Sequence, residues 1–190
     1  MIKMLNRLLK RNSLNNVPTK TEALDDSGGQ TKLDIVHRFL ALPSKHSRWR
    51  GEDWQLLRHS NAFLSVDWGL ETDEIVNQWN HLLGFDHMIS LRAPDAALTV
   101  RLDYKGHTRD FSYRASREDC FIAVLAITRL TNAEIDTRLC KDSLGNSDLC
   151  FLPLLHAEWN QLEETYGTAL LDQRFAKLPA NVDDFLELLP

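Results

Sequence analysis

The chain is 190 residues long, 43% hydrophobic and 26% charged, which is enough apolar sequence for one packed domain without stabilising disulfides or a structural metal. Residues 1–20 contain five basic residues and no acidic one, so the remainder carries 17 basic and 27 acidic side chains and a net charge of −10. Because phosphate binding needs clustered Lys and Arg, this charge argues against nucleic acid as the ligand. It fits a basic protein partner, and ordinary solubility charge is the alternative.

The first 30 residues are expected to form an arm and linker, followed by a single domain over residues 31–190. Residues 1–11 have the pattern of a short amphipathic helix, and residues 12–30 are polar with Pro18 and a glycine pair. No apolar run here is long enough for a signal peptide, and we expect no membrane span and a cytoplasmic location. An adaptor or complex subunit that docks through residues 1–30 is one alternative function.

The sequence before residue 92 shows helical and strand periodicities in turn. Thr31 and Asp34 have the spacing of a helix cap, and Gly84 stands where a helix would end. The predicted elements are a helix over 31–42, a strand over 62–68, a helix over 72–83 and a short strand over 88–91.

The stretch from 97 to 167 is expected to organise the domain. Its predicted elements are strands over 98–104 and 109–113, a helix over 120–130, strands over 135–140 and 149–155, and a helix over 155–166. Lys105-Gly106 supplies the first turn, and the helix over 120–130 is apolar on all sides and therefore buried. Two hairpins, each followed by a helix, predict an α+β fold in which an antiparallel sheet carries helices on one face, with extra N-terminal helices. Asn181 begins a last short helix.

The cysteines and histidines do not have the spacing of a metal site. His81 and His87 are six residues apart across a glycine, unlike the i, i+4 helical pair of a zinc site. Cys140 and Cys150 lie on paired strands, where a disulfide is conceivable but reduced packing residues are the preferred interpretation. Glycine-rich phosphate loops are also missing, and we expect neither a metal nor a cofactor.

Catalysis is an alternative hypothesis that lacks a motif. Ser143, Asp142 and His156 are the right types for a nucleophile, an acid and a base, but no nucleophile elbow surrounds the serine. Cys140 in a strand lacks the helix N-terminus that would lower its pKa. The alternative is therefore an enzyme of unfamiliar, hydrolase-like type that uses His156 or His81 with nearby carboxylates.

Six residues are candidates for binding a protein partner. Four acidic candidates flank the turn of the second hairpin or begin the buried helix, and they would share a rim if hairpin turns and helix ends lie at the same edge of the domain. A protein inhibitor of a basic active site would present such an acidic rim. An arginine next to a tryptophan is able to stack on a partner's surface or on a base, or to fold back onto the core. The candidates are Glu118, Asp119, Asp142, Asp148, Trp49 and Arg50.

The second half of the chain resembles the small bacterial α/β immunity proteins. The resemblance rests on the runs Val100–Gly106 and Asp142–Gly145 with Asp148, and on Trp159 and Glu163 before Tyr166-Gly167. It implies a non-enzymatic cytoplasmic protein that neutralises a toxin by capping its active surface, with a basic toxin or effector domain as the partner. The long first half departs from the compact members of that class, and the resemblance assigns no functional residue.

Overall fold

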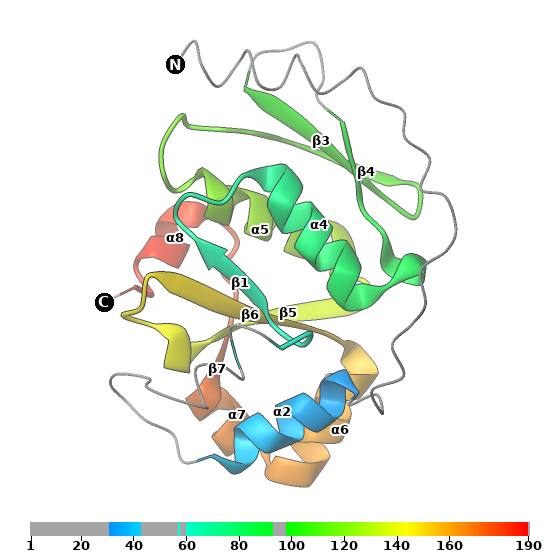
Figure 1. Ribbon diagram of the computed structural model, residues 1–190, viewed down its shortest axis with the longest axis vertical. Coiled ribbons are helices and arrows are strands. Elements are labelled where there is room, and N and C mark those ends of the chain that lie inside the picture. The colour runs from blue at the N-terminus through cyan, green and yellow to red at the C-terminus, as the bar shows by residue number, and fades with distance from the viewer. Residues whose placement is uncertain (1–30, 43–56, 58–59, 93–97, 190) are drawn as a thin grey trace.

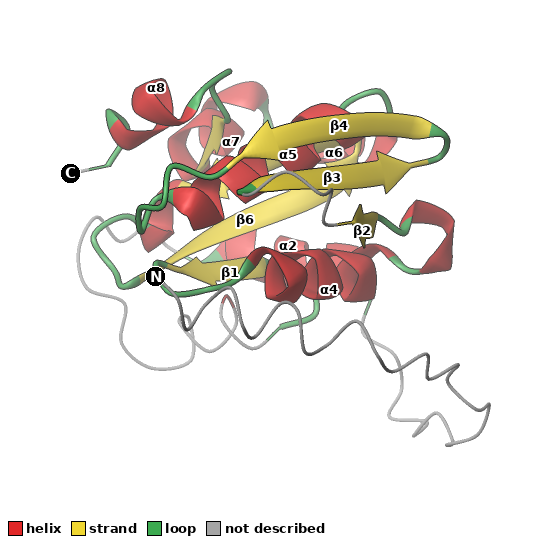
Figure 2. Cartoon of the chain, turned by 90° about the horizontal axis from the view of Figure 1, so that it is seen from above, coloured by secondary structure: helices red, strands yellow, loops and turns green. Residues whose placement is uncertain are grey.

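The computed structural model describes residues 31–42, 57, 60–92 and 98–189 (Figures 1 and 2). The α+β class predicted from the sequence is confirmed. The helices are α2 (Lys32–Ala41), α4 (Thr72–Leu83), α5 (Asp119–Thr131), α6 (His156–Tyr166), α7 (Thr168–Arg174) and α8 (Val182–Leu186), with the short 3-10 helices η1 (Phe85–His87) and η2 (Lys141–Ser143). The strands are β1 (Leu64–Asp67), β2 (Ser90–Arg92), β3 (Thr99–Tyr104), β4 (His107–Ser112), β5 (Ile135–Cys140), β6 (Asp148–Leu155) and β7 (Phe175–Lys177).

The strands form two antiparallel sheets. Sheet A has the order β1-β6-β5-β7, and sheet B has the order β2-β3-β4. Both predicted hairpins form, β3 with β4 and β5 with β6. They belong to different sheets, however, because β6 pairs with β1 and β5 pairs with β7 on the outer sides of the second hairpin.

Helix α5 is the centre of the fold, as its apolar sequence predicted. It lies between sheet A and sheet B, so that most of its surface is buried and only a few of its residues, such as Arg129, are partly exposed (Figure 1). Its core also includes Val100 and Leu102 from sheet B, Val66 and Phe151 from sheet A, and side chains from α4 and α8. Burying one Val, Leu, Ile or Phe side chain in such a core contributes about 1.5–3 kcal/mol to the free energy of folding. This core therefore packs both sheets against α5.

The other face of sheet A carries a second core. Along β6, Leu149 and Phe151 belong to the core around α5, whereas Cys150, Leu152 and Leu154 point to the opposite side. There they pack with α2, α6 and α7, which lie below sheet A in Figure 1. Helices thus cover both faces of sheet A rather than the one face expected, and this explains why β6 is apolar from Leu149 to Leu155.

The first hairpin turn and the caps at Thr31 and Asn181 lie where local signals placed them. Lys105 and Gly106 have φ values of 46° and 82°, the left-handed conformation that a two-residue hairpin turn requires. Thr31 caps α2 and Asn181 caps α8, each accepting a hydrogen bond from the backbone two or three residues into the helix. The three cysteines are buried and form no disulfide with one another. The domain boundary at residue 30 stays a prediction, because residues 1–30 lie outside the described residues.

Candidate functional site

Two of the six candidate residues lie at the start of α5, where the sequence placed them. Glu118 precedes the helix and Asp119 begins it, and both side chains are half-buried. The Asp119 carboxylate accepts hydrogen bonds from the backbone N–H groups of Arg114 (2.8 Å) and Ser116 (3.2 Å). An acid at this position also interacts favourably with the helix dipole. Arg117 partly balances the charge, since its Nε lies 3.5 Å from Glu118.

The two acids expected at the second hairpin's turn are buried instead, which corrects the predicted rim. Asp142 is 8% exposed and accepts a hydrogen bond from the fully buried Arg174. That guanidinium also donates to the carbonyls of Leu42 (2.8 Å) and Phe39 (3.3 Å), the last turn of α2. Asp148 is 5% exposed at the start of β6. Both carboxylates therefore belong to the interior. The remaining candidates, Trp49 and Arg50, lie outside the described residues and stay predictions.

Other acids gather around the start of α5, and we call them together the acidic end. Its members come from the end of β1, the start of α4 and the start of α5: Asp67, Glu71, Asp73, Glu118 and Asp119. Their effects on the pKa values of Tyr113 and Cys120 also indicate that these acids lie near one another. The pKa of Tyr113 is raised first by burial and then by the charges of Asp119, Asp73 and Glu71. Burial, followed by smaller effects of Asp67 and Asp119, raises the pKa of Cys120 to about 12.

A hydrogen bond and aromatic contacts hold together the segments that carry the acidic end. The Tyr113 hydroxyl donates a hydrogen bond to the Thr72 hydroxyl, which ties the segment before α5 to the start of α4. Trp68 packs edge-on against Phe121 of α5, with ring centroids 4.7 Å apart. The Arg117 guanidinium lies over the Trp68 ring, 4.9 Å from its centroid. Asp67 and Glu71 are exposed. Among the residues that the structure describes, Arg117 pairs with Glu118, and no ion pair joins Asp67, Glu71 or Asp119 to a cation.

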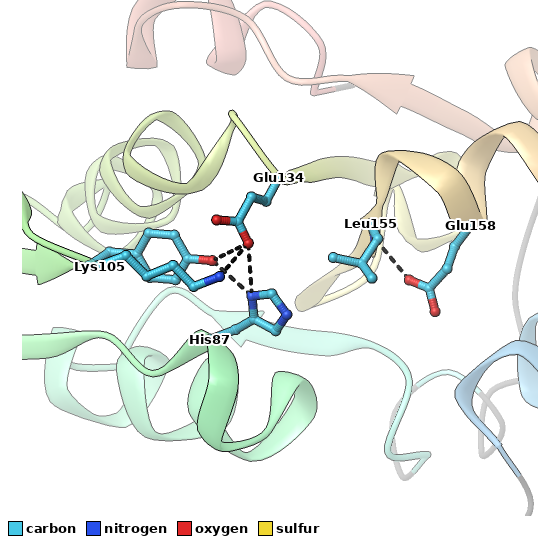
Figure 3. Close-up of polar contacts among 6 residues, drawn as sticks. His87, Lys105, Glu134, Leu155 and Glu158 are labelled. Atoms are coloured by element: carbon cyan, nitrogen blue, oxygen red, sulfur yellow. Dashed lines mark hydrogen bonds and ion pairs between the residues drawn. The ribbon is translucent and has the colours of Figure 1, made fainter.

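A second polar site, which we call the His87 cluster, lies where η1, the β3–β4 turn and the α5–β5 turn meet (Figure 3). It consists of His87, Tyr104, Lys105 and Glu134. The Glu134 Oε2 atom accepts hydrogen bonds from Lys105 Nζ at 2.5 Å and from the Tyr104 hydroxyl at 3.3 Å. His87 Nδ1 lies 2.8 Å from the Tyr104 hydroxyl and 3.5 Å from the same Glu134 oxygen. One carboxylate oxygen of Glu134 therefore contacts the side chains of Lys105, Tyr104 and His87.

The charges in this cluster stabilise one another. The hydrogen bond from Lys105 lowers the pKa of Glu134, and the same bond raises the pKa of Lys105. The pKa of Tyr104 is raised, first by burial and then by the Glu134 charge. At neutral pH these groups are thus a carboxylate, an ammonium and a neutral phenol. Histidine is the one residue type of the cluster suited to proton transfer near neutrality.

Helix α6 begins beside this cluster and is fastened to the same turn. The backbone N–H of His156 donates to the Glu134 carbonyl (3.1 Å), and His156 Nε2 lies 2.9 Å from the carbonyl of Asn132, where α5 ends. Glu158 accepts from the Leu155 N–H at 2.8 Å and caps α6 (Figure 3). These bonds give His156 a structural role at the junction of the two helices.

The remaining catalytic candidates occupy structural positions or stand alone. Ser143 is fully buried, and its hydroxyl donates to the Cys140 carbonyl (2.7 Å) and accepts from the Cys150 N–H (2.9 Å), which closes the β5–β6 turn. Burial raises the pKa of Cys140 well above its ordinary value, so this thiol is a poor nucleophile. His81 is exposed in the last turn of α4.

The sequence did not reveal the His87 cluster. Lys105 was visible as a turn residue and His87 as an unmatched histidine, but nothing in the spacing brings them to Glu134. Within the described ranges, no group of three or more His, Cys, Asp or Glu side chains is placed to hold a metal ion. The helices that the structure describes include none with the length and apolar character to cross a membrane. Comparison with protein-family models, with curated proteins and with solved structures finds no match.

Proposed function

We propose that this chain is a non-enzymatic protein-binding module that uses its acidic end to bind a basic partner. The observation that carries the proposal is the convergence of five carboxylates from β1, α4 and α5 on a base built around the buried helix α5. A surface on which carboxylates outnumber the neighbouring cations attracts a partner of the opposite sign, and a preorganised surface limits the entropy lost on binding.

The finer proposal is that the chain is an immunity protein and that its partner is a toxin or effector domain. It rests on the sequence resemblance and on the fit between an acidic surface and an active site that is basic because it acts on an anionic substrate. The protonation states of the His87 cluster also favour binding over catalysis. Its acid is held charged and its lysine is held protonated, so neither is suited to proton transfer at neutral pH.

The test is protection of cells from a toxin encoded beside this chain, with the chain supplied from a second plasmid. The wild-type chain is expected to restore growth. The double variant Glu71→Gln with Glu118→Gln, which keeps side-chain size and removes two charges from the acidic end, is expected to protect less. Glu164→Gln, an exposed acid on α6, is the matched control and is expected to protect fully. Equal protection by the double variant would contradict the assigned surface, and no protection by the wild type would contradict the immunity role.

A second candidate function is supported by one observation on His87. Its Nδ1 is held by the Tyr104 hydroxyl near Glu134, while its second ring nitrogen points away from the cluster (Figure 3). This is the arrangement of an oriented general base. In the hydrolase-like alternative, His87 therefore replaces His156 and His81 as the candidate base. Turnover of ester or phosphodiester model substrates that is lost in His87→Gln would favour this enzyme. Docking through residues 1–30 stays a prediction, and it is tested by whether a partner protects these residues from proteolysis.

A further inference from the structure

A hollow of about 240 Å³ lies between β4, helix α5 and the segment before α8. One wall is an i, i+3, i+4, i+7 stripe of α5, formed by Ile122, Leu125, Ala126 and Arg129. The inner face of β4 forms the opposite wall, because Phe111 and Arg109 pair across the sheet with the buried residues Val100 and Leu102. The hollow therefore combines apolar surface with two guanidinium groups.

Arg109 and Arg129 differ from the other charged residues at the hollow. In the part of the chain that the structure describes, neither Arg109 nor Arg129 makes an ion pair or a side-chain hydrogen bond. The other charges at the hollow cancel. Asp110 takes two hydrogen bonds from Arg101, at 2.7 and 2.8 Å. Arg114 donates two to Asp183, at 2.6 and 3.1 Å. As far as the described residues show, the hollow thus retains the two positive charges of Arg109 and Arg129.

This arrangement is unfavourable in the free protein. Both arginine side chains are half-buried, and arginine does not lose its proton to escape repulsion. The pKa of Arg109 is lowered, first by burial and second by the charge of Arg129, which places the two groups within electrostatic reach of each other. An anion between them would remove the repulsion and supply acceptors for both guanidinium groups.

We propose that this hollow binds a small phosphate monoester whose organic part is apolar. A monoester phosphate carries a charge near −2 at pH 7, which matches the two arginines better than a single carboxylate does. Guanidinium groups bind phosphate through paired hydrogen bonds. The stripe of Ile122, Leu125 and Ala126 with Phe111 provides the surface for the organic part.

The size of the hollow sets the scale of the ligand. A volume of about 240 Å³ corresponds to about eight molecules of liquid water at about 30 Å³ each, room for a phosphate group and one ring. This favours a free small molecule over a long segment of a partner chain. The site does not rest on the proposed protein-binding function, because its ligand has the opposite charge to the partner of the acidic end.

The test is isothermal titration of the full chain with phenyl phosphate, with inorganic phosphate and phenol as the two halves of that probe. Phenyl phosphate is expected to bind saturably, inorganic phosphate more weakly and phenol not at all. Arg109→Gln and Arg129→Gln are expected to weaken phenyl phosphate binding by about tenfold or more each. Arg92→Gln makes the same change on the far strand of sheet B, at an exposed side chain paired with Asp103, and is expected to bind like the wild type.

Thermal unfolding of the same variants separates a binding role from a structural one. Because each substitution removes one of two repelling charges, the free Arg109→Gln and Arg129→Gln proteins are expected to unfold at or above the wild-type temperature. Wild-type affinity in both variants, equal binding of phenol and phenyl phosphate, or no binding at millimolar phenyl phosphate would overturn the proposal. Saturation by a phosphotyrosine peptide alone would also overturn it and would assign the hollow to a protein partner.

Discussion

The ion pair between Arg174 and Asp142 is expected to be the most sensitive point of the fold. Arg174 is fully buried at the end of α7, and it joins η2 to the last carbonyls of α2, with its guanidinium 4.1 Å from the Phe39 ring. Removing one partner of a buried pair leaves an uncompensated charge and costs about 3–5 kcal/mol. We therefore expect Arg174→Met to lower the free energy of unfolding by that amount, a large fraction of the roughly 5–15 kcal/mol typical of a domain.

Urea unfolding followed by tryptophan fluorescence measures this change, since the chain contains five tryptophans. Arg174→Lys is the first control. It keeps the charge but loses the planar fork that reaches Asp142 and the two carbonyls together, so it is expected to be intermediate. The double variant Arg174→Met with Asp142→Asn removes both charges and is expected to recover part of the loss. A loss below about 1 kcal/mol in Arg174→Met, or no recovery in the double variant, would refute this explanation.

Three further predictions concern a turn, a thiol and the His87 cluster. Gly106→Ala is expected to cost about 1 kcal/mol in urea unfolding, because φ at this position is 82°; an unchanged midpoint would contradict the turn assignment. Cys120, whose pKa burial raises to about 12, is expected to resist iodoacetamide at pH 8 in the folded protein and to react in urea; rapid labelling of the folded chain would contradict its burial. Lys105 lowers the pKa of Glu134 below its ordinary value of 4.5, so the stabilising effect of the Glu134 carboxylate is present above pH 4.5 and is lost as the pH falls through the lowered pKa. Glu134→Gln is therefore expected to lower the free energy of unfolding at pH 7 and not near pH 2. Equal losses at both pH values would refute the ion-pair role.

Local elements could be read from the sequence because their signals are local. The apolar run after Asp119 has helical length, and a helix apolar on all sides fits between two sheets. Lys105-Gly106 specifies a tight hairpin turn by backbone conformation alone. Helix α7 and strand β7 were missed because they are short, and β7 exists through its pairing with the distant strand β5.

The candidate site was harder to predict because it depends on packing between distant segments. Asp142 looked like a turn residue in contact with solvent, and only Arg174, 32 residues further on, explains its burial. Glu118 and Asp119 were found because helix starts carry acids, but their location at the same end of the molecule as Glu71 requires α4 to lie beside α5. Alternation along one strand does not tell which sheet faces which helix, so the division of the hairpins between two sheets was also hidden.

The most direct test of the proposed binding surface is the salt dependence of association between this chain and the basic toxin or effector domain that we propose as its partner, measured by stopped-flow fluorescence. If the acidic end guides binding, the wild-type association rate falls steeply with ionic strength, and Glu71→Gln with Glu118→Gln lowers both the rate at low salt and the steepness of that fall, while Glu164→Gln changes neither. An association rate that is independent of salt, or the same salt dependence in the double variant as in the wild type, would contradict the central claim.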